Sequence, residues 1–231
     1  MIKAILLDID NTLLSFDEYV KDAMRTGFKE FNLCKYDESM FSVFTEINNK
    51  LWHSLEKGEI DLEGLKKVRW SMIFESLGIS YDGVLFEKYF RSRLFESAIP
   101  VNGAMELLSY LHGKYILCAA SNGPYNQQVN RLKICGMLPY FEHLFISEEI
   151  GYSKPSEKFF EACLNRLNAS SVDRITPDEI MMIGDSLSSD MAGGIQFGTR
   201  TCFYNPNNKA VPPETSIDYT VTELTEISNI L

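Results

Sequence analysis

Residues 2–12, IKAILLDIDNT, decide the fold class of this chain. Six mostly apolar residues end directly at an aspartate, which is typical of a strand buried on both faces of a parallel sheet. Similar runs follow at 115–120, 143–147 and 179–183, and a weaker one lies at 201–204. Segments with helical periodicity separate them, at 104–112, 126–134, 157–167 and 190–197. Strands that alternate with helices predict an α/β fold with a Rossmann-like, doubly wound parallel sheet.

Residues 15–97 interrupt this alternation. They contain no buried strand and show helical periodicity, with turn signals at Gly58, Gly78 and Gly83. The segment holds 15 of the 28 aromatic residues of the chain and both tryptophans. We therefore predict two domains, a core of residues 1–14 and 98–231 and an all-helical insert of residues 15–97 after the first strand.

The charge balance restricts the partners of the protein. The 231 residues include 22 Lys and Arg against 32 Asp and Glu, a net charge of −10, and no basic patch is visible. Nucleic-acid polymers and anionic membranes are bound through Lys and Arg patches, so neither is expected as a partner. On net charge alone, a small anionic substrate is also disfavoured. The sequence is compatible with a monomer or a homodimer.

The cysteines and the hydropathy indicate the cellular location of the protein. The five cysteines are widely spaced without a C-x-x-C pair, which disfavours a disulfide framework and a zinc site. The first apolar run is broken by Asp8, and no stretch approaches the roughly 20 apolar residues of a membrane span. We therefore expect a cytoplasmic protein in a reducing environment, neither exported nor embedded in a membrane.

Polar motifs follow the four main predicted strands. They are Asp8-x-Asp10-x-Thr12 after the first strand, Ser121-Asn122-Gly123 after the second, Lys154-Pro155 after the third, and Gly184-Asp185 with Asp190 after the fourth. In an open α/β sheet the carboxyl ends of the strands carry the reactive groups. These side chains are therefore expected to form one site.

Four carboxylates of this edge cannot share a site unless a cation or protons relieve their repulsion. They are Asp8, Asp10, Asp185 and Asp190. Mg²⁺ is the expected cofactor, since it binds through one or two carboxylates together with substrate phosphate. One carboxylate can act as a nucleophile and form an aspartyl phosphate. A second carboxylate two residues further on can protonate the leaving oxygen and then activate water.

Neutral and basic residues at the same edge complete a phosphate-binding set. Ser121 and Asn122 precede a predicted helix with Pro124 in its first turn, so hydroxyl, amide and backbone N–H groups are available there. Lys154, with Pro155 expected to enter the next helix, supplies a charge that can neutralise a transferring phosphoryl group. We predict Ser121, Asn122 and Lys154 as the phosphate-binding residues.

The four motifs, in this order, resemble those of the haloacid-dehalogenase-like (HAD) superfamily of phosphohydrolases, which act through an aspartyl phosphate. The resemblance implies that Asp8 is the nucleophile and a magnesium ligand. Asp10 would be the general acid and base, would ligate the metal through its backbone carbonyl and would be positioned by Thr12. Asp185 would be the second carboxylate ligand, with Asp190 supporting the metal through water or from the surrounding residues.

The same resemblance extends to the phosphate site and the insert. Ser121 and Lys154 would bind the phosphoryl group. The helical insert resembles the C1 cap of the superfamily, which closes over the site and excludes water.

Two of the motifs narrow the expected substrate. Asp-Asn-Thr-Leu at 10–13 and Ser-Asn-Gly at 121–123 resemble house-cleaning pyrimidine 5′-nucleotidases and N-acylneuraminate-9-phosphatases. A nucleoside 5′-monophosphate, in particular a pyrimidine one, is the expected substrate, and a sugar or sugar-acid phosphate is the alternative. Among the aromatic residues of the insert, Phe16 and Tyr19 are the first candidates for contact with the substrate. The arginines of the insert could reach a second anionic group, but they are expected on a solvated face; they are Arg25, Arg69, Arg91 and Arg93.

Three other functions compete with this one. A phosphomutase would keep every motif and differ only in how the cap shields the intermediate from water. A haloacid dehalogenase needs no protonating carboxylate two residues after its nucleophile, so Asp10 disfavours it. A regulatory module with a dead site would be expected to lose Asp8, Asp10 or Asp185, and all three are present.

The distribution of charge removes the objection to an anionic substrate. The core holds 17 acids and 10 bases, and the four predicted site carboxylates make up more than half of this excess. Bound Mg²⁺ together with Lys154 would make the site locally receptive to phosphate.

Overall fold

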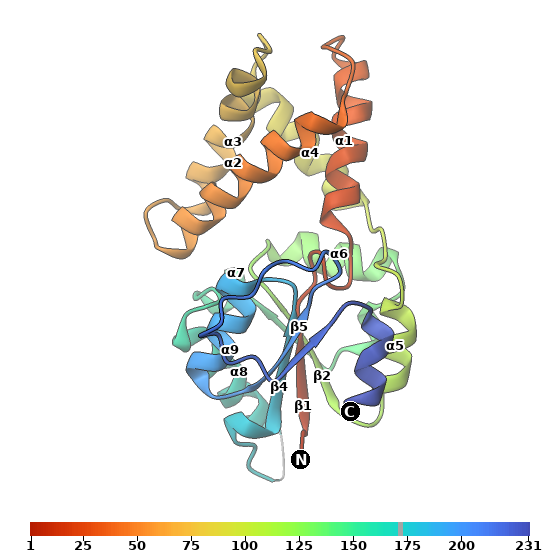
Figure 1. Ribbon diagram of the computed structural model, residues 1–231, viewed down its shortest axis with the longest axis vertical. Helices are drawn as coiled ribbons and strands as arrows, with labels where there is room; N and C mark the ends of the chain where they lie inside the picture. Colours follow the sequence, from red (N-terminus) through yellow and green to blue (C-terminus); the bar gives the residue numbers. More distant parts are fainter. Residues whose placement is uncertain (171–172) are drawn as a thin grey trace. The chain divides into compact units, whose positions relative to one another are not determined.

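The computed structural model of the chain describes residues 1–170 and 173–231. Within them, the core is a six-stranded parallel sheet in the order β3-β2-β1-β4-β5-β6 (Figure 1). Its strands are β1 (Ala4–Leu7), β2 (Ile116–Ser121), β3 (His143–Ile146), β4 (Ile180–Gly184), β5 (Arg200–Tyr204) and β6 (Tyr219–Val221). The predicted α/β class with a doubly wound parallel sheet is confirmed.

The central strand β1 is buried on both faces. Ile5 and Leu7 belong to one apolar cluster, whereas Ala4 and Leu6 belong to the other. This division arises because successive side chains of a strand point to opposite faces of the sheet. The continuous apolar run of the sequence is therefore explained by helices on both faces.

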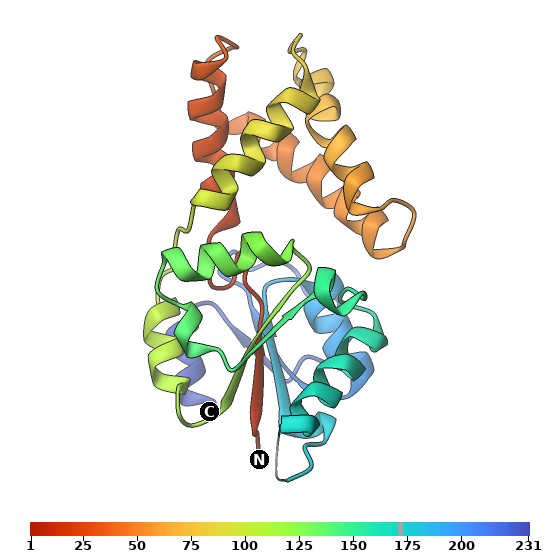
Figure 2. The ribbon, with the colours of Figure 1, turned by 180° about the vertical axis from the view of Figure 1, so that it is seen from behind.

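Helices cover the two faces as Figures 1 and 2 show. On one face lie α5 (Ala104–Leu111), α6 (Tyr125–Ile134) and the 3₁₀ segment η4 (Leu224–Asn229). On the other lie α8 (Glu157–Ser170) and α9 (Ala192–Phe197). Each helix buries one apolar side against the sheet, so the core has three layers.

Short elements complete the connections. They are η1 (Leu138–Tyr140), α7 (Ser147–Ile150), η2 (Pro177–Glu179) and a π-helical turn, η3 (Leu187–Met191), that leads into α9. Pro155 does not enter a helix as expected. It lies in a turn closed by the Ser156 N–H, which donates to the Ser153 carbonyl (2.9 Å), and α8 begins only at Glu157.

The strand β1 ends within two residues of the ends of both of its neighbours. Leu7 pairs with Ala119 of β2 and with Ile183 of β4. The Asp8 N–H then donates to the Ile183 carbonyl (2.9 Å). The residues that follow these three strands therefore leave the sheet at one edge.

The insert forms a compact unit of its own. Residues 16–97 make one unit, and residues 1–15 with 98–231 make the other. The insert consists of α1 (Phe16–Glu30), α2 (Glu38–Glu56), α3 (Leu62–Leu77) and α4 (Gly83–Glu96). Its core is aromatic, and the largest buried side chains are Phe28, Phe44, Trp70, Phe74, Phe86 and Phe90.

Local signals begin and end the helices of the insert. The side chains of Asp37, Asp61 and Asp82 accept backbone N–H groups at the starts of α2, α3 and α4. Gly83, expected in a turn, is instead the first residue of α4. A Cβ atom there would lie 2.2 Å from the Ser71 backbone nitrogen, so glycine allows α4 to approach α3. Among the described residues, no helix is long and apolar enough to cross a membrane.

Candidate active site

The Lys154 ammonium connects residues from three parts of the core. Its Nζ atom donates to Asp8 Oδ1 (2.7 Å), to Asp190 Oδ1 (2.6 Å) and to the Ala120 carbonyl (2.6 Å). These bonds use all three ammonium hydrogens, and Lys154 is only 1% exposed. Burial lowers the pKa of Lys154, but the charges of Asp190 and Asp8 outweigh this effect and raise it. The side chain is therefore held in its charged form.

Three carboxylates form a cluster, and two of them, Asp8 and Asp190, bind this ammonium. One oxygen from each of Asp8, Asp185 and Asp190 lies within 4.8 Å of the others. Burial raises the pKa of Asp8 well above its usual range, and the charge of Lys154 offsets only part of this. The neighbouring carboxylates of Asp190 and Asp185 raise that pKa further. A divalent metal ion could bind these oxygens and would relieve the repulsion.

Glycine and backbone contacts hold Asp190 in the cluster. A Cβ atom on Gly184, at the end of β4, would lie 2.1 Å from Asp190 Oδ2, so a side chain cannot be accommodated there. The Ser186 N–H donates to the same oxygen (3.1 Å). Asp190 is 1% exposed. The glycine of this motif therefore makes room for the carboxylate that follows it.

Lys209 adds a second positive charge beside the cluster. Its Nζ atom lies 3.3 Å from Asp185 Oδ2 and 3.3 Å from the Asp185 carbonyl. Its backbone is fixed by Asn205, whose side chain accepts the Lys209 N–H (2.7 Å) and donates to its carbonyl (3.0 Å). The sequence analysis missed Lys209. The signal was available, because its loop follows β5 and that strand ends at the same edge of the sheet.

Asp10 is held by side chains of α6. Arg131 Nη1 donates to Asp10 Oδ1 (2.5 Å), and Gln128 Nε2 donates to Asp10 Oδ2 (2.6 Å). Thr12 was expected to position Asp10, but its Oγ1 has no hydrogen-bond partner among residues 1–170 and 173–231. Positioning of Asp10 therefore falls to Arg131 and Gln128, which bind both carboxylate oxygens.

Ser121 and Asn122 differ in what they can offer a phosphate. The Ser121 hydroxyl accepts from the Gly123 N–H (3.1 Å) and from Gln128 Nε2 (2.8 Å). The Asn122 side chain is bonded at both its oxygen and its nitrogen to the backbone of Lys154. Asn122 therefore joins the second motif to the third, whereas the Ser121 hydroxyl keeps its hydrogen for another acceptor.

Gln128 and Arg131 are site residues that the sequence analysis missed. They lie three positions apart on α6, next to Leu132, and all three are buried. Residues three and four apart share one side of a helix. The signal was thus a polar pair on the apolar side of the helix that follows the Ser-Asn-Gly motif.

The two aromatic candidates of the insert lie in different surroundings. Tyr19 is 3% exposed, and its hydroxyl donates to the Phe90 carbonyl. Phe16 is half-buried and packs against Tyr19, Phe44 and Phe90. Tyr19 is therefore part of the aromatic core of the insert, whereas the Phe16 side chain stays partly accessible.

The arginines of the insert also differ in their exposure to solvent. Arg25, Arg91 and Arg93 are exposed, as expected. The expectation was wrong for Arg69, which is 5% exposed. Its Nε and Nη2 atoms donate to Glu87 (3.0 and 2.6 Å), and its Nη1 atom donates to Asn48 (3.1 Å). Burial is tolerated because each end of the guanidinium has a partner.

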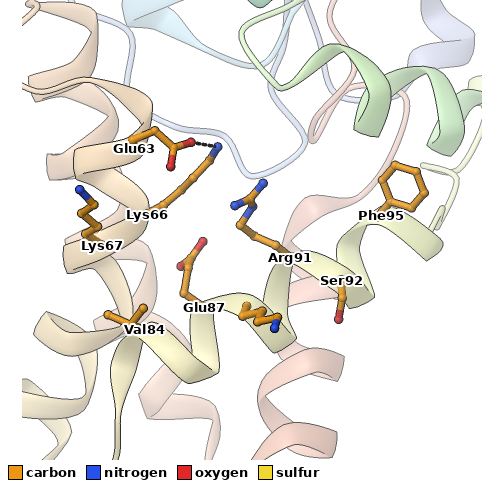
Figure 3. A pocket seen from close by; sticks show the side chains of 9 residues that line it. Glu63, Lys66, Lys67, Val84, Glu87, Arg91, Ser92 and Phe95 are labelled. Carbon is orange, nitrogen blue, oxygen red and sulfur yellow. Dashed lines mark hydrogen bonds and ion pairs between the residues drawn. The ribbon is translucent and has the colours of Figure 1, made fainter.

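A groove with several basic side chains runs between α3 and α4. It encloses about 530 Å³, and its lining is shown in Figure 3: Glu63, Lys66, Lys67, Val84, Glu87, Lys88, Arg91, Ser92 and Phe95. Lys66 pairs with Glu63 (2.6 Å) within it. Four bases against two acids make the groove locally positive, in contrast to the chain as a whole.

A family model for haloacid dehalogenase-like hydrolases matches residues 2–198 of the chain. The chain belongs to this family. PynA of Streptococcus pneumoniae, a pyrimidine 5′-nucleotidase, is 32% identical over 89% of this HAD hydrolase and 85% of its own length. YjjG of Escherichia coli, another pyrimidine 5′-nucleotidase, is 30% identical over 98% of this chain and 96% of its own length.

YfnB of Bacillus subtilis is similar to this HAD hydrolase in both sequence and structure. The two sequences are 31% identical over 99% of this chain and 95% of YfnB. The crystal structure of YfnB bound to magnesium matches with a TM-score of 0.89, covering 100% of this chain and 98% of that one. The superfamily, the hydrolase class and the α/β core with its helical insert are therefore confirmed as predicted.

Proposed function

We propose that this HAD hydrolase is a Mg²⁺-dependent phosphomonoesterase that acts through an aspartyl phosphate at Asp8. The position of the Lys154 ammonium, between Asp8 and Asp190 in the carboxylate cluster, carries the proposal. Even with Lys209 beside Asp185, three carboxylates against two ammonium groups leave a negative charge in excess. Such a site would repel a phosphate unless a cation were bound.

The donor set fits Mg²⁺, because the cluster offers only oxygen atoms, which are the ligands that this ion prefers. The side chains of Asp8 and Asp185 and the backbone carbonyl of Asp10 would hold it, with Asp190 fixing Lys154 beside them. When bound, the ion would neutralise charge on the phosphoryl oxygens.

Two half-reactions then use the carboxylates of this chain. In the first, an Asp8 oxygen attacks phosphorus, the ester P–O bond breaks and Asp10 gives a proton to the leaving oxygen. In the second, Asp10 takes a proton from water, the resulting hydroxide attacks phosphorus and the P–O bond to Asp8 breaks. Inorganic phosphate leaves, and both carboxyl groups return to their starting states. Ser121 would bind a phosphoryl oxygen throughout, and Lys154 would bind the phosphoryl group through its positive charge and through the hydrogen that Asp8 gives up when it attacks phosphorus.

A pyrimidine nucleoside 5′-monophosphate is the proposed substrate. The similarity to PynA and YjjG over most of the chain supports it. The aromatic insert supplies side chains of the kind that stack on a base, and Phe16 is the proposed contact. A sugar or sugar-acid phosphate is the alternative outcome.

A substrate panel tests the proposal. We expect Mg²⁺-dependent release of phosphate from a generic aryl phosphate, and faster release from pyrimidine than from purine 5′-monophosphates. Preference for N-acylneuraminate 9-phosphate would overturn the substrate class, and isomerisation of a sugar monophosphate would indicate a mutase. Asp8→Asn should abolish turnover, because it removes the nucleophile; a variant that retained most of the activity would contradict the covalent mechanism.

A further inference from the structure

Gln128 connects the proposed acid and base to the proposed phosphate site. Its Nε2 group donates to Asp10 Oδ2 (2.6 Å) and to Ser121 Oγ (2.8 Å), while its Oε1 accepts from Arg131 Nη1 (2.9 Å). A primary amide has two donor hydrogens, so both are used. Its orientation is fixed, because a guanidinium can only donate, so the amide atom that faces Arg131 Nη1 must be the oxygen.

These bonds determine where the Ser121 hydroxyl can point. Its oxygen accepts from Gln128 Nε2 and from the Gly123 N–H, and a hydroxyl has two acceptor lone pairs and one donor hydrogen. Because both lone pairs are taken, the hydrogen must be directed away from Gln128 and Gly123. It is therefore set to donate to a ligand oxygen.

The backbone leaves room for the Gln128 amide at Gly123. A Cβ atom at position 123 would lie 2.5 Å from Gln128 Nε2, closer than the 3.0 Å that real Cβ contacts respect. A side chain at 123 would force the amide to move. Gly123 and Gln128 thus form one packed unit with Ser121.

Arg131 completes the network from inside the protein. Arg131 is 1% exposed and Gln128 is 0% exposed, so neither can exchange its partners for water. A buried guanidinium without a carboxylate partner is costly. Arg131 therefore binds Asp10 and Gln128 in a fixed arrangement, and Asp10 is held at both oxygens.

We propose that Gln128 and Arg131 are positioning residues of the reaction. Gln128 aims the Ser121 hydroxyl at the phosphoryl group and holds Asp10, while Arg131 holds Asp10 and the Gln128 amide. Both act through other residues and neither touches the substrate. The inference rests on the proposed function, because it assigns these residues through Asp10 and Ser121.

Variants of similar size separate the role of Gln128 in phosphate binding from the role of Arg131 in holding Asp10. We measure kcat on an aryl phosphate with Mg²⁺ and the Kd of inorganic phosphate by calorimetry. Gln128→Met should lower kcat at least tenfold and raise the phosphate Kd at least fivefold. Arg131→Met should lower kcat at least tenfold but raise the phosphate Kd by less than Gln128→Met does, because it leaves the bond from Gln128 to Ser121 in place. Arg131→Lys should recover part of kcat, because it keeps one donor, and Lys133→Met, exposed on the same helix, is the control.

Two further variants keep the test decisive. In a Ser121→Ala background, Gln128→Met should not weaken phosphate binding further, because the hydroxyl that it aims is gone. Gly123→Ala retains every polar group but displaces the Gln128 amide, so it should lower kcat and raise the phosphate Kd as Gln128→Met does. This variant tests the inference even if Arg131→Met fails to fold.

Two outcomes would overturn the inference. One is a Gln128→Met enzyme with kcat and phosphate Kd within twofold of the wild type. The other is an equal loss of phosphate affinity in Gln128→Met and Arg131→Met, which would indicate general disruption of the packing. If the wild type showed no turnover, the proposed function would fail, and the effect of Gln128→Met on phosphate binding would then decide the inference alone.

Discussion

Asn122 and Lys154 are joined by two reciprocal hydrogen bonds. Asn122 Nδ2 donates to the Lys154 carbonyl (2.8 Å), and the Lys154 N–H donates to Asn122 Oδ1 (2.9 Å). The two residues are 32 positions apart in the chain. The bonds fix the backbone from which the Lys154 side chain reaches Asp8 and Asp190. Asn122 thus acts on the phosphate site through Lys154.

Asn122→Ala is therefore expected to impair both stability and catalysis. Loss of two hydrogen bonds to a partly buried backbone costs about 1–3 kcal/mol, measurable by urea unfolding. The freed Lys154 backbone should lower kcat/KM on an aryl phosphate by roughly tenfold or more, since each 1.4 kcal/mol is a tenfold change. Asn49→Ala, exposed on α2, is the control. Full activity in Asn122→Ala would show that Lys154 is positioned without it.

Metal binding should depend on Asp185. A ligand that binds only the folded state raises the melting temperature, so Mg²⁺ is expected to stabilise the wild type in a concentration-dependent manner. Asp185→Asn removes one charge from the cluster and should raise the Mg²⁺ Kd at least tenfold, measured by calorimetry. Asp22→Asn, exposed on α1, should leave that Kd unchanged. Equal Mg²⁺ affinity in Asp185→Asn and the wild type would place the ion elsewhere.

The sheet could be predicted from the sequence because its strands are buried on both faces. Burial on both faces produces continuous apolar runs, as in Ala4–Leu7, and the polar motifs follow directly where such runs end. Parallel order then brings the ends of β1, β2 and β4 to one edge. Topology therefore brings the segments that carry Asp8, Lys154 and Asp190 to one edge of the sheet, and local hydrogen bonds then fix the side chains.

The network around Asp10 could not be predicted in this way. Arg131 on a helix is usually a solvated side chain, and its burial here is stabilised by Asp10, 121 positions earlier in the chain. The prediction that Arg69 is exposed was wrong for a similar reason, because pairing with Glu87 makes its burial possible. Helical periodicity can place a charged residue on the apolar side of a helix, but it does not identify the distant residue that pairs with it.

The buried pair of Arg69 and Glu87 should be needed for the stability of the insert. Arg69→Met leaves the Glu87 carboxylate buried without its partner and is expected to cost about 3–5 kcal/mol in urea unfolding. The double variant Arg69→Met with Glu87→Leu should recover at least half of this loss, because both charges are removed. Arg93→Met, exposed on α4, serves as the control. A double variant no more stable than Arg69→Met would show that packing, not the unpaired charge, accounts for the cost.

Buried thiols should make the protein sensitive to alkaline pH. Burial raises the pKa of Cys202 from 9.0 to about 12, and burial also raises the pKa of Cys118 and Cys163. Above pH 9 the unfolded chain releases these protons while the folded chain retains them. The free energy of unfolding therefore falls as pH rises, by about 1.4 kcal/mol per pH unit for each thiol.

Cys202→Ala isolates one of these contributions. The substitution leaves a small cavity that lowers stability at every pH, but it removes one titrating thiol, so the slope between pH 9 and pH 11 should be flatter by about 1.4 kcal/mol per pH unit. Cys34 is exposed, and Cys34→Ala should keep the wild-type slope. The slope is measured by urea unfolding at several pH values. An unchanged slope in Cys202→Ala would mean that the thiol titrates alike in the folded and unfolded chain, which its burial in the core beside β4 argues against.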